Sequence, residues 1–190
     1  GGKHAVIVAV NDYLASDGRK LLADKRTLTF QRYPTQLLLD FDIVFTAEHG
    51  DCRIGDMKDS GFSVRVPTSM DVDSKKDGRI INSEGLTDKN AWGKRAKWVS
   101  YTGKVEGKVR GIAILNHPES FRHPTPWHVR TYGLFTANPF GTRSIAKEND
   151  GTFVLEKGKS FSLRHRVIFH EGNTAEADIS KAWVDYVSGT

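Results

Sequence analysis

The sequence predicts an all-β fold, an antiparallel β-sandwich with one C-terminal helix. Apolar residues recur at every second position over most of the chain, and turn residues separate these stretches at short intervals. Only the last part of the chain places apolar residues at helical spacing. Many short strands joined by turns are typical of sandwiches rather than of doubly wound sheets. A chain of 190 residues can bury one core, so we expect a single domain over residues 1–190.

The strands are predicted from the alternation of apolar and polar residues. Residues 35–48 show it most clearly, because Asp40, Asp42 and Thr46 lie between apolar positions, as in a strand with one buried face. The apolar positions are Leu37, Leu39, Phe41, Ile43 and Phe45. Further strands are expected at residues 4–14, 26–33, 61–66, 96–103, 109–117, 129–138 and 160–172. Turns are expected at Asp17-Gly18, His49-Gly50-Asp51, Asp77-Gly78, Glu84-Gly85, Thr102-Gly103, Asp150-Gly151 and Lys157-Gly158.

One helix is expected at the C-terminus, in the stretch NTAEADISKAWVDYV. Asn173 is the expected N-cap, and Glu176 follows three residues later in a variant of the capping box. The residues at helical spacing are Ala175, Ile179, Ala182, Trp183 and Tyr186. We expect this stripe to pack against the sheet.

Composition and charge limit the classes of partner. The net charge is +5, but the 28 Lys and Arg residues are scattered among 23 Asp and Glu. Without a basic stripe or a nucleic-acid-binding motif, no nucleic-acid partner is expected. The apolar runs are far shorter than the about 20 residues that span a bilayer, so we expect a soluble protein with no membrane partner. The only cysteine, Cys52, excludes an intrachain disulfide and a multi-cysteine zinc site.

The best site candidate is the stretch NHPESFRHPTPWHVRTYGLFTANPFG, residues 116–141. It contains His117, His123 and His128, and Pro118, Pro124 and Pro126 stiffen the chain between them. A stiff loop holds its side chains ready for a ligand at a low entropic cost. Since residues two apart share a face of an extended chain, His128 and Arg130 should point together, with Trp127 and Val129 opposite.

Three interpretations of these histidines are open: metal ligands, acid–base or ligand contacts, or hydrogen bonding within a proline-rich turn. Because the spacing lacks a tight pattern such as HxH or HExxH, no metal and no cofactor are predicted. Two other stretches offer cations and aromatic rings. In GDMKDSGFSVRV, Lys58 and Arg65 suit contacts to substrate oxygens, and Lys58 could also act as a base. In AWGKRAKW, Trp92 suits stacking on a sugar ring.

Long motifs resemble those of a known family. The stretches GDMKDSGFSVRV, WGKRAKWVSYTG, HPESFRHPTPWHVRTYGLFTANPFG and LRHRVIFHEG, in this order, resemble a bacterial domain-of-unknown-function family that carries the label "methane oxygenase PmoA". The matching motif positions are Lys58, Arg65, Trp92, His117, Pro124, His128, Arg130 and Asn138. Methane oxidation is not expected, because the methane monooxygenase subunit of that name is an integral membrane protein and this chain has no span.

The resemblance implies a galactose-mutarotase-like supersandwich, or part of one, and an association with carbohydrate. Family members typically carry an upstream segment, so the chain resembles a C-terminal portion of a member with an exposed sheet edge. Such an edge would allow a homo-oligomer to form. The absence of an initial methionine is compatible with removal of a signal peptide, which would place the protein in the periplasm or outside the cell.

We therefore expect a carbohydrate-associated protein that binds or transforms a sugar or sugar acid in a cleft lined by residues 116–141. If it is an enzyme, a cofactor-independent mutarotase-, lyase- or hydrolase-like reaction is expected, with His128, His123 and Lys58 as the catalytic set. The expected substrate-binding residues are Arg65, Trp92, His117, Trp127, Arg130 and Asn138. The alternative is a non-catalytic carbohydrate-binding or protein-interaction module, since such folds host both.

Overall fold

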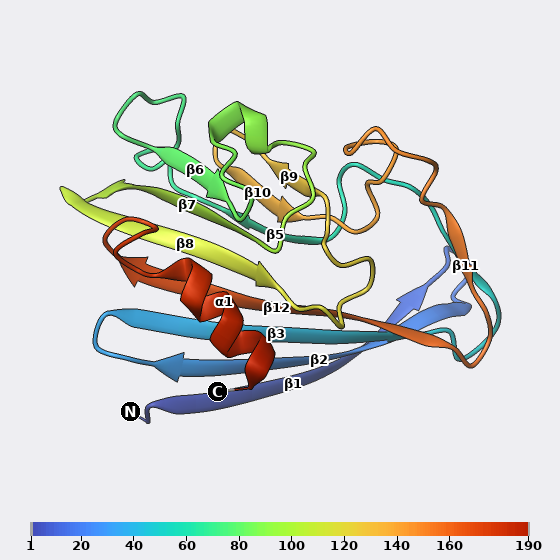
Figure 1. Cartoon of the computed structure of the whole chain (residues 1–190). Coiled ribbons are helices and arrows are strands. Elements are labelled where there is room, and N and C mark those ends of the chain that lie inside the picture. Colours follow the sequence, from blue (N-terminus) through green and yellow to red (C-terminus); the bar gives the residue numbers. More distant parts are fainter. Residues whose placement is uncertain (1, 190) are drawn as a thin grey trace.

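Antiparallel pairing joins most of the strands into one large sheet. The computed structural model describes residues 2–189, and its largest sheet has seven strands in the order β1-β2-β3-β12-β8-β7-β6 (Figure 1). The strands are β1 (His4–Leu14), β2 (Lys20–Arg32), β3 (Gln36–Thr46), β12 (Ser160–Glu171), β8 (Lys108–Asn116), β7 (Trp98–Val105) and β6 (Arg79–Asn82). The predicted all-β class with antiparallel sheets is confirmed, and the sandwich type stays a prediction.

Smaller elements complete the fold. A three-stranded sheet, the small sheet, has the order β5-β10-β9, and β11 pairs with β4. Their bounds are β5 (Phe62–Arg65), β10 (Leu134–Ala137), β9 (Trp127–Val129), β11 (Phe153–Leu155) and β4 (Cys52–Ile54). A 3-10 helix, η1, spans Asp88–Ala91, and one α-helix, α1, spans Ile179–Ser188 near the C-terminus, as predicted. No helix among residues 2–189 is both long and apolar enough to cross a membrane.

The large sheet is apolar on both faces around β7, β8 and β12. Neighbouring residues of a strand point to opposite faces, so each strand contributes to two cores. One core contains Val99, Ile114 and Val167 of these strands with Trp127, Val129 and Phe135 of the small sheet. The other contains Trp98, Leu115 and Ile168 with Ile179 and Tyr186 of α1. The small sheet therefore covers one face and α1 covers the other (Figure 1).

The predicted alternation in β3 is confirmed over most of its length. Its residues Leu39, Phe41, Ile43 and Phe45 belong to the buried clusters. Asp40 and Asp42 lie on the other face, where they pair with Arg166 at 2.6 Å and Arg164 at 3.3 Å. Leu37 is the exception, because it lies near the end of the strand and remains 37% exposed.

Two local predictions are wrong, and glycine explains both. Residues 129–138 do not form one strand: the chain reverses between β9 and β10, where Gly133 adopts φ 93° and its N–H donates to Arg130 O. Gly103 lies inside β7 rather than in a turn, and a Cβ there would lie 2.5 Å from Met70 Cα. The actual turn follows at Glu106-Gly107, where both residues have positive φ.

The helix begins later than predicted. Asn173 Oδ1 accepts the N–H groups of Ala175 and Glu176, and Glu176 Oε2 accepts the N–H of Asn173, so the predicted capping box forms. It stabilises a turn, however, and the N-cap of α1 is Asp178. Ala175 is therefore exposed before the helix instead of packing on the sheet, whereas Ile179 is 1% exposed.

Five of the seven histidines have a pKa lowered first of all by burial: His117, His123, His128, His165 and His170. His165 is the extreme case, because complete burial lowers its pKa to about 3. Its ring stacks on Phe62 with centroids 5.3 Å apart. The unfolded chain binds protons at these histidines that the folded chain does not. The stability of the fold is therefore fully present above a pH of about 6.5, and part of it is lost as the pH falls toward the folded pKa values.

The free energy of unfolding should therefore decrease from pH 7 to pH 5, with about 2 kcal/mol of the decrease from His165 alone. We expect His165→Gln to lower the free energy of unfolding at pH 7. At pH 5 the difference in this free energy between variant and wild type should be smaller by about 2 kcal/mol. Urea unfolding at the two pH values measures both differences. Phe62→Leu disturbs the same packing without removing a titratable group, so its difference in unfolding free energy from the wild type should not depend on pH. A difference that is also constant for His165→Gln would contradict the lowered pKa of His165.

Candidate functional site

The chain between β4 and β5 is held by one carboxylate. Asp56 accepts hydrogen bonds from the N–H groups of Arg143, Ser144 and Gly151 and from the hydroxyl of Thr142. Burial alone would raise the pKa of Asp56, but the backbone N–H of Arg143 and the other donors lower it far below its usual range. Asp56 therefore fixes its own segment to the loop after β10.

Asn138 positions the same segment between β4 and β5 through its side-chain amide. Its side chain is fully buried, and Nδ2 donates to Met57 O at 3.0 Å and to Lys58 O at 2.8 Å. Its Oδ1 accepts the N–H of Phe140. Both Nδ2 protons are used within the protein, so Asn138 holds this segment in place, and its predicted contact to a ligand stays a prediction.

His128 lies beside this segment on β9 and is 1% exposed. Its Nδ1 lies 3.2 Å from Lys58 O, and a carbonyl only accepts, so Nδ1 carries the proton of the neutral ring. Nε2 is then free of a proton, and it is buried without a hydrogen-bond partner among the described residues. Burial lowers the pKa of His128, and the nearby charges of Lys58 and Arg130 lower it further. The ring is therefore neutral at pH 7.

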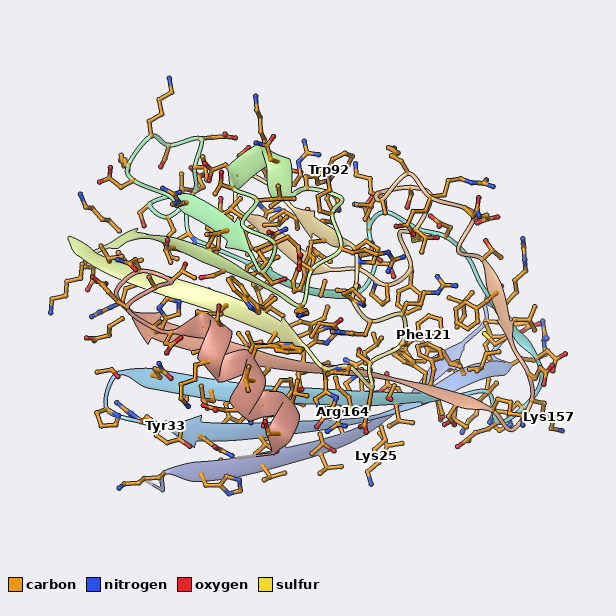
Figure 2. The ribbon with its side chains drawn as sticks, in the orientation of Figure 1. Lys25, Tyr33, Trp92, Phe121, Lys157 and Arg164 are labelled. Carbon is orange, nitrogen blue, oxygen red and sulfur yellow. The ribbon has the colours of Figure 1, made fainter. Side chains whose placement is uncertain are left out.

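The ring of Trp92 packs edge-on against His128, with centroids 6.5 Å apart. Two cations lie over the same indole: Arg130 at 5.4 Å and Lys147 at 5.8 Å from the centroid. A recess of about 300 Å³, which we call the Trp92 recess, is lined by Lys89, Trp92, Val129, Arg130 and Thr131. Figure 2 shows Trp92 on the side of the molecule that carries η1 and the small sheet.

A second aromatic ring extends the positive surface. The guanidinium of Arg130 lies 5.3 Å from the centroid of Tyr132, and that of Arg65 lies 6.0 Å from the same ring. Arg65 reaches this position because β5 pairs with β10, which places it opposite Leu134. We call Arg65, Arg130 and Lys147, with the two rings between them, the cationic strip. Three cations in a row over aromatic faces suit an anionic, ring-shaped ligand.

The predicted alternation along β9 is confirmed. Trp127 and Val129 are fully buried in the core between the sheets, whereas His128 points to the other side. Trp127 Nε1 donates to Ala96 O at 3.0 Å. With no exposed face, Trp127 is a core residue in this structure and does not offer the stacking surface that was expected.

His128 lies apart from His117 and His123, which both contact α1. His117 contacts Tyr186 of α1 edge-on at 5.1 Å, and His123 lies parallel to Trp183 of α1 at 6.4 Å. His123 Nδ1 also lies 2.9 Å from Asn116 Oδ1. His128 shares none of these contacts, so the structure offers no facing pair of His123 and His128 for acid–base catalysis. Within residues 2–189, no three His, Cys, Asp or Glu side chains converge on a position that could hold a metal ion.

A larger recess, of about 530 Å³, lies near the β2–β3 turn. It is lined by Leu37, Ile112 and Phe169, together with Arg32 and Arg110. None of the predicted site residues belongs to this lining. Its apolar residues continue the core of the large sheet beyond the small sheet, since Ile112 packs against that core. We therefore place the candidate site at the smaller Trp92 recess, which contains the predicted site residues Trp92 and Arg130 and lies beside His128.

Sequence comparison assigns the chain to a family. The profile of DUF6807, described as a family of unknown function, matches residues 1–184. The chain belongs to this family. The predicted membership of an unknown-function family is thus confirmed, while the PmoA label stays a prediction. No curated protein and no solved structure matches this DUF6807 chain.

Three parts of the candidate site were not predicted from the sequence. Lys147 and Tyr132 carried no pattern of their own, because their role depends on contacts with Trp92 and Arg130. Asp56 was not among the predicted site residues, although it binds backbone N–H groups that hold the segment beside His128. An Asp beside a glycine in a turn is the only local signal that could have indicated this.

Asp56→Asn should lower the free energy of unfolding by roughly 2 kcal/mol at pH 7, because the charged acceptor of several N–H groups is lost. The native pKa of Asp56 is depressed, so its stabilisation is present above a pH of about 4 and is lost below it. The gap between wild type and variant should therefore shrink on acidification, as measured by urea unfolding at neutral and acidic pH. Asp59→Asn, at an exposed carboxylate nearby, is the matched control and should leave stability nearly unchanged.

Proposed function

We propose that the protein binds a sugar acid at the Trp92 recess, with the carboxylate on the cationic strip and the sugar ring against an indole face. The observation that carries this proposal is the pair of cations, Arg130 and Lys147, held over Trp92. Indole faces stack on the C–H faces of sugars, and a guanidinium offers a fork of donors that matches a carboxylate. The carbohydrate association implied by the resemblance agrees with this ligand class.

Binding is favoured over catalysis because the recess holds no acid–base pair. Its lining residues include two cations, Lys89 and Arg130, but no carboxylate and no histidine. A ligand carboxylate would replace the ring as the partner of Arg130 and so leave an indole face free for the sugar. A neutral sugar has no carboxylate to pair with Arg130. The recess should therefore bind sugar acids more tightly than neutral sugars.

Uronic acids should raise the melting temperature of the protein, because a ligand that binds only the folded state stabilises it by mass action. Galacturonate and glucuronate are compared with galactose and glucose in a thermal-shift titration. Arg130→Gln should weaken uronate binding roughly tenfold or more, since a charge-assisted pair is lost. Trp92→Ala should weaken it as well.

Arg19→Gln is the matched control, because Arg19 is exposed in the turn after β1 and its side chain pairs with Asp17, away from the recess. Equal shifts with neutral sugars, or an Arg130→Gln variant that binds uronates like the wild type, would contradict the proposal. Added salt should weaken the uronate shift, since the contact is ionic and exposed.

A second candidate function is proton transfer by His128, favoured by its proton-free Nε2 and its neutral ring. In that function Nε2 would remove the proton α to the carboxylate of a bound sugar acid after a local opening exposes it. The test is exchange of that proton with deuterium in heavy water, followed by NMR. His128→Asn, whose amide can still donate to Lys58 O, should abolish exchange without abolishing binding. Exchange that persists in the variant excludes His128 as the base.

A further inference from the structure

Strand β1 forms one edge of the large sheet and is exposed on both faces. It pairs with β2 on one side only, and it is the last strand of the sheet at that end (Figure 1). Val8 is 56% exposed and Val10 is 72% exposed, and Val6 and Ile7 are similarly uncovered. These side chains are the most apolar part of a strand that nothing in residues 2–189 covers.

The free hydrogen-bonding groups of β1 belong to its even-numbered residues. Lys3 O, at the start of the strand, accepts the N–H of Arg32 and so points toward β2. In a strand the N–H and C=O of one residue point to the same side, and this side alternates along the chain. The residues that point away from β2 are therefore His4, Val6, Val8, Val10 and Asp12.

This edge lacks the devices that protect other edges. Natural edge strands are kept short, or carry Lys, Pro or a bulge that prevents further pairing. The opposite edge, β6, spans only Arg79–Asn82. By contrast, β1 runs from His4 to Leu14, has no charge or proline between Ala5 and Asn11, and has its only register shift at Tyr13/Leu14. An edge of this length and composition is suited to a partner strand.

We propose that the partner is a second copy of this chain, paired antiparallel through β1 about a two-fold axis at Val8. The outward-facing residues read His4, Val6, Val8, Val10, Asp12, which is self-complementary when reversed. His4 then lies opposite Asp12 of the second copy, Val6 lies opposite Val10 of the second copy, and the two copies of Val8 lie opposite each other. The two-fold symmetry repeats each of these pairs, as an isologous interface requires.

The neighbouring registers fit less well. If Val8 lay opposite Val10, then His4 would face Leu14 and Asp12 would face Val6, so a charge would lie against an apolar side chain. If Val8 lay opposite Val6, then His4 would face Val10 and Asp12 would face the chain before β1. Only the register centred on Val8 places polar residues against polar residues and valine against valine. Cross-strand matching of this kind is what fixes register in sheets.

The dimer is tested first by sedimentation equilibrium of the full chain from low micromolar to submillimolar concentration. We expect a reversible monomer–dimer equilibrium. Val8→Lys places like charges opposite each other at the axis and should raise the dimer dissociation constant roughly tenfold or more. Thr27→Lys is the matched control, because Thr27 is the neighbour of Val8 on β2 and lies off the edge. It should leave the dissociation constant unchanged, and circular dichroism should show both variants folded.

A second experiment tests the register through cysteine cross-linking in a Cys52→Ser background. Directly opposite residues in an antiparallel pair have Cα atoms about 5.5 Å apart, within the range that a disulfide spans. Val8→Cys should therefore give a covalent dimer on mild oxidation. Val10→Cys should not, because the two copies of residue 10 would lie four residues apart along the strands, about 14 Å.

A monomer at every concentration would overturn the proposal. So would a dimer that Val8→Lys leaves intact, or a dimer that cross-links through Val10→Cys in preference to Val8→Cys. A monomer that gains a different protein as a strand partner would equally overturn it, since the occupant proposed is a second copy.

Discussion

The apolar character of β7, β8 and β12 on both faces is the constraint on which the rest of the structure depends. A sheet with only one apolar face can leave the other in water, but here each face must be covered. The small sheet supplies Trp127 and Phe135 to one side, and α1 supplies Ile179 and Tyr186 to the other. Once the small sheet is fixed by its inward residues, its outward residues His128 and Arg130 are fixed as well, so the candidate site follows from core packing.

Local pattern was sufficient for much of the fold. The period of two located β3, β8 and β12, and the alternation along β9 correctly separated His128 from Trp127. It failed where a glycine changes the chain direction inside an alternating stretch, as at Gly133, and where a side chain caps a turn before the helix, as at Asn173. In both cases the local residue types fitted two conformations, and long-range packing selected between them.

The site was less predictable than the fold, because nearness in sequence was a poor guide to nearness in space. The proline-rich chain of residues 116–141 passes from contacts with α1 to the outer side of the small sheet, and so it separates His117 and His123 from His128. The partners that His128 and Trp92 do find come from elsewhere: Lys58 through its carbonyl and Lys147 through its charge. Neither contact has a local sequence signal.

Lys58 acts on His128 chiefly through its backbone. Its carbonyl oxygen accepts from both Asn138 Nδ2 and His128 Nδ1, and it thereby fixes which nitrogen of the imidazole is protonated. Any residue with the same backbone conformation provides this oxygen, so the side chain at position 58 can change while the tautomer of His128 is preserved. Whatever selects a lysine at this position must therefore act through its side chain and not through the imidazole tautomer.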